Sequence, residues 1–179
     1  MRLALALTTG LFALGVTLAQ PASAVPDAAA ADGLVSCPLG VQNTSYTPGL
    51  TFTAPAPHVD VDSTGTLGPC VSLDLQHTAG TYHFTGSGNL NCLGGSSAGS
   101  GKIVWTNPGT TPSRFTFTST LALRPDGTTV LVSTGPVTSG DYAGHTITNT
   151  VVITSPDVLA CTTPSGLTST AGPFLITIV

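Results

Sequence analysis

Hydrophobic and polar residues alternate with a period of two along most of the chain. The clearest run is SRFTFTSTLAL, in which Phe115, Phe117, Leu121 and Leu123 share one face and polar residues share the other. Successive side chains of a β-strand point to opposite faces, so this run predicts a half-buried strand. The turn signal RPDG and the alternating run TTVLVST follow it. Together they predict a β-hairpin.

The same alternation recurs in runs bounded by glycine, proline and asparagine, whereas strong helix formers are scarce. β-Branched residues, which favour strands, are abundant. We therefore predict an all-β fold, an antiparallel meander of about 8–10 strands that closes as a barrel or folds as a two-sheet sandwich. The other expected strands lie at 80–92, 102–106, 144–155 and 174–179, with shorter ones at 50–53 and 58–62.

The first residues have the features of a secretory signal peptide. Arg2 precedes an uncharged apolar run, and small residues stand at Ala22 and Ala24, where a signal peptidase reads the chain. The run is near the short limit for a membrane span, and no basic cluster follows it. We expect a signal peptide at 1–24, a flexible leader at 25–35 and a single all-β domain at 36–179. A secreted, extracellular protein with no membrane span in the mature chain follows from this division.

Four cysteines lie beyond the expected cleavage site, at Cys37, Cys70, Cys92 and Cys161. An even number in an exported chain predicts two disulfides. A zinc site would need closely spaced pairs, which are absent from the sequence. Three pairings are open, and we favour the nested one, with Cys70–Cys92 closing a local loop and Cys37–Cys161 joining the ends of the domain.

Charge is sparse, at 7% of residues with a net charge of −4. The sequence has eight aspartates and no glutamate, and only Lys102, Arg114 and Arg124 are basic after the signal peptide. So few cations cannot neutralise a phosphate backbone, which argues against nucleic acid as a partner. The partner we expect is an extracellular polymer or protein. We expect no cofactor.

The stretch PHVDVDSTG places His58, Asp60 and Asp62 on one face of a strand. One imidazole and two carboxylates are metal-ligating groups, so these residues are weak metal candidates. Val59 and Val61 face the other way, as in a surface strand with one wet face. We favour the surface strand, and therefore expect no metal site.

Tyr82, Trp105, His145 and Asn149 share the parity of inward-facing residues and would line a cavity if the barrel had one. Scattered histidines and the lack of glutamate make an acid–base pair hard to assemble, so we expect no catalytic residue and no enzyme. The favoured function is a non-catalytic extracellular binding module. The alternative is a carrier for a small apolar ligand inside the barrel, and a secreted hydrolase is the third hypothesis.

The segments SCPLGVQ, YTPGLTFT, LGPCVS, ALRPDGTTV and GLTSTAG resemble a group of small secreted proteins of actinomycetes. Those proteins are Thr- and Gly-rich all-β chains with no assigned activity. The resemblance spans most of the chain from about Ser36 onward, and its motifs are turns and cysteines. It implies an exported actinobacterial β-domain and assigns no site residue.

Overall fold

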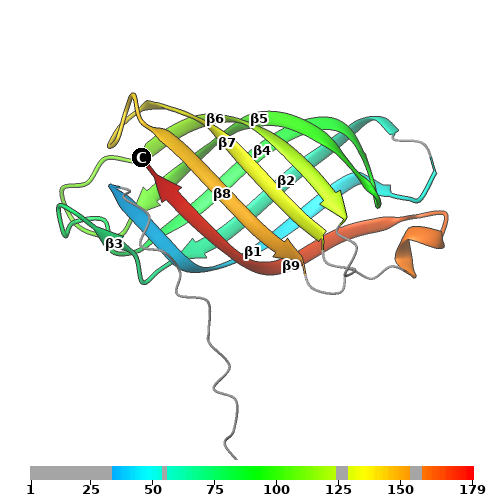
Figure 1. Cartoon of the computed structure of the whole chain (residues 1–179), viewed down its shortest axis with the longest axis horizontal. Coiled ribbons are helices and arrows are strands. Elements are labelled where there is room, and N and C mark those ends of the chain that lie inside the picture. Colours follow the sequence, from blue (N-terminus) through cyan, green and yellow to red (C-terminus); the bar gives the residue numbers. More distant parts are fainter. Residues whose placement is uncertain (1–33, 54–55, 124–128, 154–158) are drawn as a thin grey trace, which may run out of the picture.

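The computed structural model of the protein describes residues 34–53, 56–123, 129–153 and 159–179. In this part of the chain, eight antiparallel strands close into a barrel (Figure 1). The barrel strands are β1 (Val35–Leu50), β2 (Ala56–Leu67), β4 (Gly80–Asn91), β5 (Gly94–Trp105), β6 (Ser113–Leu123), β7 (Thr129–Ser139), β8 (Thr146–Ile153) and β9 (Leu167–Ile178). A two-residue strand, β3 (Val71–Ser72), and a short 3₁₀ helix, η1 (Ala160–Thr162), complete the described elements.

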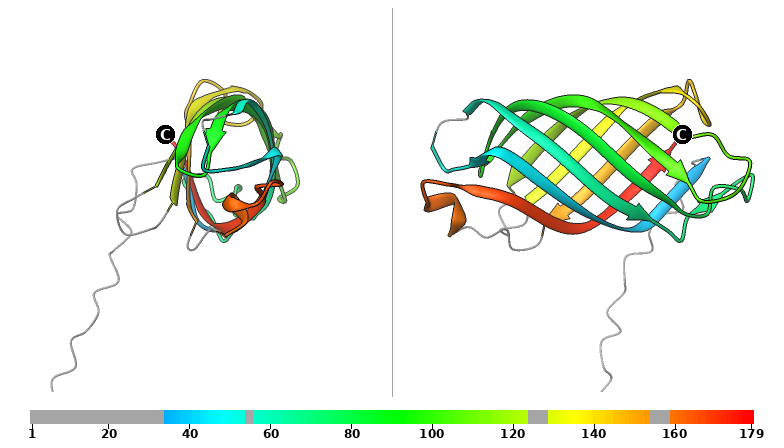
Figure 2. Two further views of the ribbon diagram at one scale, coloured as in Figure 1. Left: turned by 90° about the vertical axis from the view of Figure 1, so that its right-hand side faces the viewer. Right: turned by 180° about the vertical axis from the view of Figure 1, so that it is seen from behind.

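The strand order is β2-β4-β5-β6-β7-β8-β9-β1, and the ring closes where β1 pairs with β2. The view turned toward the barrel end shows the closed ring (Figure 2). β3 adds to β1 at that strand's first residues. The predicted all-β meander is confirmed, and of the two architectures left open the structure has the barrel.

β1 is the element that the sequence pattern predicted least well. Its sixteen residues include Pro38 and Pro48, which cannot donate to a strand ladder. Both prolines lie where the β1–β9 register shifts, between Cys37 and Gly40 and again after Ser45. Such irregularities let a strand continue past a missing donor. The strand expected at 50–53 is wrong, because β1 ends at Leu50 and the residues that follow it form a bend.

The predicted disulfide pairing is also wrong. Cys37 bonds to Cys70, and Cys92 bonds to Cys161. The first bridge links the start of β1 to the segment after β2, at the β3 end of the barrel. The second links the β4–β5 turn to η1 at the opposite end. The nested pairing would have joined cysteines at opposite ends, separated by the length of a twelve-residue strand such as β4, roughly 40 Å.

Aromatic rings fill the middle of the barrel. The ring of Tyr82 lies 5.2 Å from that of Phe174, and the ring of Phe84 lies 4.8 Å from that of Phe117. Gly99 on β5 leaves space for the Phe117 ring and for the close approach of β4. A Cβ added at this position would lie 2.9 Å from Phe117 and 2.1 Å from the Thr85 carbonyl oxygen. The inward positions predicted for Phe115, Phe117 and Leu121 are confirmed, and the side chain of Leu123 lies outside the described residues.

Polar side chains form a second feature of the interior. The amide of Asn149 donates to the Tyr82 hydroxyl at 2.9 Å, and that hydroxyl faces the Gln42 carbonyl oxygen at 3.5 Å. Gln42 donates to Thr44, whose hydroxyl lies 2.8 Å from that of Ser63. A chain of polar groups thus crosses the interior from β8 to β2, and each member is buried.

Candidate functional site

The inward-facing candidates belong to the core rather than to a large cavity. Tyr82, Trp105 and Asn149 are buried, as the strand parity predicted. The hollow beside Tyr82 and Asn149 measures only about 10 Å³. A second, apolar hollow near the Cys92–Cys161 bridge measures about 60 Å³. Sites for drug-sized ligands usually measure about 300–1,000 Å³, so neither hollow has the volume of such a site.

His145 does not face inward, and its place as a cavity-lining residue is wrong. It is exposed and precedes β8, which begins at Thr146. The prediction assumed that the alternation of β8 continues back to residue 145. That residue precedes the strand and follows a turn, where side chains do not alternate between two faces. Tyr142 has a φ of 64° and Gly144 a φ of 89° in this turn, which redirects the chain before the strand starts.

The opening run of β2 lies on the outside of the barrel. His58, Asp60 and Asp62 are exposed, whereas Val59 and Val61 are buried. His58 pairs with Asp60 at 2.9 Å, and Asp62 pairs with His83 on the neighbouring strand at 3.0 Å. The carboxylates are therefore divided between two imidazoles. Within the described residues, no group of three histidine, cysteine or aspartate side chains is arranged to hold a metal ion.

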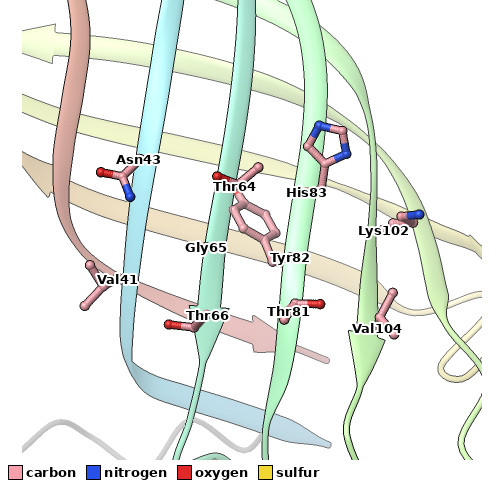
Figure 3. Close-up of a pocket in the computed structure, with 10 residues that line it drawn as sticks. All are labelled: Val41, Asn43, Thr64, Gly65, Thr66, Thr81, Tyr82, His83, Lys102 and Val104. Atoms are coloured by element: carbon pink, nitrogen blue, oxygen red, sulfur yellow. The ribbon is translucent and has the colours of Figure 1, made fainter.

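A large hollow of the described residues lies on the outer wall, over β1, β2, β4 and β5, and we call it the outer groove (Figure 3). Its volume is about 470 Å³. The backbone at Gly65 and Tyr82 forms its floor, and two rows of outward side chains form its sides. The register places Val41, Thr66, Thr81 and Val104 in one row, and Asn43, Thr64, His83 and Lys102 in the other.

A smaller hollow of about 230 Å³ adjoins the outer groove on the far side of the second row. It shares His83 and Lys102 with the groove and adds Thr85, Ser100 and Arg114. Alternation along the strands produces both hollows, because outward side chains stand about 7 Å apart along a strand and leave a channel between successive rows. The wall thus offers hydroxyl, amide and cationic groups to a ligand outside the barrel.

A cluster that sequence reasoning missed lies at the β3 end of the barrel. The buried His77 ring places Nδ1 2.8 Å from Asp74 and Nε2 2.8 Å from Asp141. The Tyr142 hydroxyl lies 2.6 Å from Nδ1, and the Trp105 ring meets the His77 ring edge-on at 4.8 Å. These residues come from two loops and a strand, the β3–β4 loop, the β7–β8 turn and β5, so no local spacing in the sequence predicted the cluster.

The pKa values of Asp74 and Tyr142, two members of this cluster, are shifted from their usual values. Burial opposes ionisation of Asp74, but hydrogen bonds from the Gln76 backbone, Ser72 and Tyr142, with the charge of His77, lower its pKa to about 2. Burial, together with the neighbouring Asp74 carboxylate, raises the pKa of Tyr142. Asp74 therefore stays ionised and Tyr142 stays protonated across the neutral range.

The geometry of this cluster suits a structural role. Both ring nitrogens of His77 face carboxylate oxygens, so both can donate only when the ring is an imidazolium. The side chain is only 7% exposed, and each of its nitrogens already has a partner. Neither ring nitrogen is therefore free to act on a reactant. Through its contacts with Asp74 and Asp141, the ring links the β3–β4 loop to the β7–β8 turn.

We compared the chain with protein-family models, curated proteins and solved structures, and none of them gave a significant match. The helices within the described residues include none with the length and hydropathy needed to cross a bilayer. The fold and the candidate site define a disulfide-linked β-barrel whose interior is packed and whose main hollow lies on its outer wall.

Proposed function

We propose that the protein is a secreted, non-catalytic binding module that holds an extracellular polymer against the outer wall of its barrel. The observation that carries the proposal is the position of the hollows. The outer groove measures about 470 Å³, whereas the hollows among inward-facing side chains measure about 60 and 10 Å³. The outer groove has a volume usual for a binding site, as does a hollow of about 350 Å³ over β4, β5 and β6 on the same outer wall, whereas the two interior hollows do not.

Export is supported by the signal-peptide features of residues 1–24 and by the two disulfides. Disulfides persist in oxidising compartments and are rare in the cytosol. The resemblance to secreted actinomycete proteins supports an actinobacterial source. The two bridges lie at opposite ends of the barrel, an arrangement that suits a protein exposed to the medium.

The chemistry of the groove suits a polymer with many hydroxyl groups. Thr64, Thr66 and Thr81 present hydroxyls, and Asn43 presents an amide, at the regular spacing of a sheet. Hydroxyls and amides both donate and accept hydrogen bonds, as sugar hydroxyls do. Paired strands on all sides hold this wall in place, so little conformational entropy is lost when it binds a ligand.

The apolar-ligand carrier is the weaker candidate. It would need an interior of several hundred cubic ångströms, and aromatic rings occupy the middle of the barrel. The hydrolase hypothesis has least support. His77 has partners on both nitrogens. His58 is exposed and paired with Asp60, and Nε2 of His83, at the edge of the outer groove, is paired with Asp62, so none of the three forms an acid–base pair with a nucleophile in a cleft.

Retention on immobilised polymers tests the proposal. The oxidised protein is passed over a panel of neutral and acidic polysaccharides and over purified bacterial cell walls. We expect retention on at least one polymer, loss of retention in Thr81→Phe, which fills the outer groove, and no loss in the matched variant Thr134→Phe on β7. Failure to bind any polymer, or equal retention of the two variants, would overturn the outer-wall proposal.

A further inference from the structure

The lysine and the arginine of the described residues stand next to each other on the outer wall. Lys102 on β5 is directly opposite Arg114 on β6, and His83 on β4 is directly opposite Lys102. All three side chains are exposed. Directly opposed residues have Cβ atoms about 4.5–5.5 Å apart. The lysine and the arginine of the described residues therefore lie in one row with His83, which we call the cationic row.

This arrangement is unfavourable for the protein alone. Like charges directly opposite each other on a sheet destabilise it. His83 is paired with Asp62 at 3.0 Å. Within the described residues, by contrast, the side chains of Lys102 and Arg114 have no hydrogen bond or ion pair. Two adjacent cations thus remain available to an anion from outside.

The outer groove and the hollow of about 230 Å³ both open onto the cationic row. The hollow of about 230 Å³ is lined by Lys102 and Arg114 together with the hydroxyl-bearing Thr85 and Ser100. The outer groove begins on the other side of Lys102 and continues over uncharged residues toward β1. A ligand lying across the strands would meet two cations over β5 and β6, and hydroxyl and amide groups over β2 and β1.

We propose that the polymer bound by this wall is anionic, a linear hydroxyl-bearing chain whose carboxylate or phosphodiester groups lie at Lys102 and Arg114. This inference rests on the proposed function and specifies its ligand class. The planar guanidinium of Arg114 matches the two oxygens of a carboxylate or phosphate, and Lys102 adds a compact charge. Asp60 and Asp62 on β2 repel anions, so the charged groups lie over β5 and β6 and the neutral part of the polymer lies over β1 and β2.

The test is binding of the oxidised protein to four immobilised polymers. Polygalacturonate supplies carboxylates, a glycerol-phosphate polymer supplies phosphodiesters, dextran is neutral, and single-stranded DNA is a polyanion without the same hydroxyl chemistry. We expect binding to one or both of the first two, and which one binds identifies the source of the anion. Binding weakens as ionic strength rises from about 0.01 to about 0.15 M, because the Debye length falls from about 30 to about 8 Å.

Variants locate the anion. Lys102→Gln and Arg114→Gln are each expected to weaken binding roughly threefold and together about tenfold, the effect of losing one or two exposed charge contacts. Lys102→Arg keeps the charge and binds like the unmodified protein. Thr150→Asp on β8 is the matched control, because it changes the net charge by the same amount as Lys102→Gln but lies across the barrel from β4. Thermal unfolding shows that the variants are folded, and the double variant is expected to be no less stable.

The outcomes separate this inference from the proposed function. Equal binding to dextran and to the anionic polymers, blocked by Thr81→Phe, leaves the binding module standing and overturns the anionic ligand. If DNA binds as well as the anionic hydroxyl-bearing polymers, or if Thr150→Asp weakens binding as much as Lys102→Gln, the interaction depends only on overall charge. Either result also overturns the anionic ligand. Binding to none of the four polymers overturns the anionic ligand, and the wider polymer panel then decides the proposed function.

Discussion

Replacing Tyr82 by phenylalanine tests how much the buried polar chain contributes to stability. The Tyr82 hydroxyl is the acceptor for the Asn149 amide at 2.9 Å, and the Asn149 carbonyl oxygen has no partner within the described residues. Both side chains are buried, at 2% and 4% exposure. Without the hydroxyl, the Asn149 side chain would lose the hydrogen bond that it has.

A buried polar group left without a partner costs about 1–3 kcal/mol. We therefore expect Tyr82→Phe to lower the free energy of unfolding by about 1–3 kcal/mol. A domain of this size loses about 2–4 °C of melting temperature per kcal/mol. The change is measured by chemical denaturation with both disulfides intact.

A second substitution isolates the cause. Asn149→Val removes the amide that would be stranded, and valine suits a strand. Since replacing both partners of a hydrogen bond by apolar groups is nearly neutral, the double variant should be more stable than Tyr82→Phe alone. Tyr46→Phe is a matched control, because the hydroxyl of Tyr46 bonds to Thr170, which is only partly buried and can turn to water. We expect it to cost less than Tyr82→Phe.

Additive effects of Tyr82→Phe and Asn149→Val would refute this reasoning. The hydrogen bond would then not be the source of the cost, and lost packing of the Tyr82 ring would have to explain it. An equal cost for Tyr46→Phe would point the same way, since a generic loss of a tyrosine hydroxyl would account for both.

Three further predictions concern alkaline titration, the long-range disulfide and the buried histidine. Burial raises the pKa of all three tyrosines above 10.0, so the folded protein should show little phenolate absorbance at that pH. Because the unfolded chain releases these protons first, stability should fall as the pH rises above about 10. The bridge Cys92–Cys161 spans 69 residues, so its removal as a pair of alanines should cost about 4 kcal/mol in denaturant unfolding. Asp141→Asn removes a charge from the Nε2 side of His77 and should cost about 1–3 kcal/mol in the same assay.

Each of these three has a contrary result. Half-ionised tyrosines at pH 10 in a folded sample would contradict their burial. Non-reducing peptide mapping that joins Cys70 to Cys92 would contradict the disulfide pairing, and a loss well under 1 kcal/mol in the double alanine variant would contradict its contribution. Unchanged stability in Asp141→Asn would mean that His77 does not need that carboxylate.

Alternation predicted the later strands well because each of them has one face in the barrel interior and the other in solvent. Phe115, Phe117 and Leu121 face inward as expected, and so do Tyr82 and Trp105. The same rule failed at His145, where the strand had not yet begun. Alternation also failed to predict β1. The prolines in that strand are tolerated only where the register with β9 shifts, and these shifts depend on the partner strand.

The candidate site was harder to foresee. His58, Asp60 and Asp62 were singled out because they are close in sequence, and they form part of an exposed surface. The cationic row was not visible, because Lys102 and Arg114 are twelve residues apart and become neighbours only through the β5–β6 register. The cluster around His77 joins loops that are more than sixty residues apart.

The sequence by itself determined the class of fold and the inward or outward face of most strand residues, because alternation is a local property of an extended chain. It also predicted that the four cysteines form two disulfides. The tertiary structure alone decided that the sheet closes as a barrel, which cysteines pair, and which side chains meet on the outer wall. Those outcomes depend on the register between strands and on which strand ends share an end of the barrel, and neither is encoded by the spacing of residues within one segment.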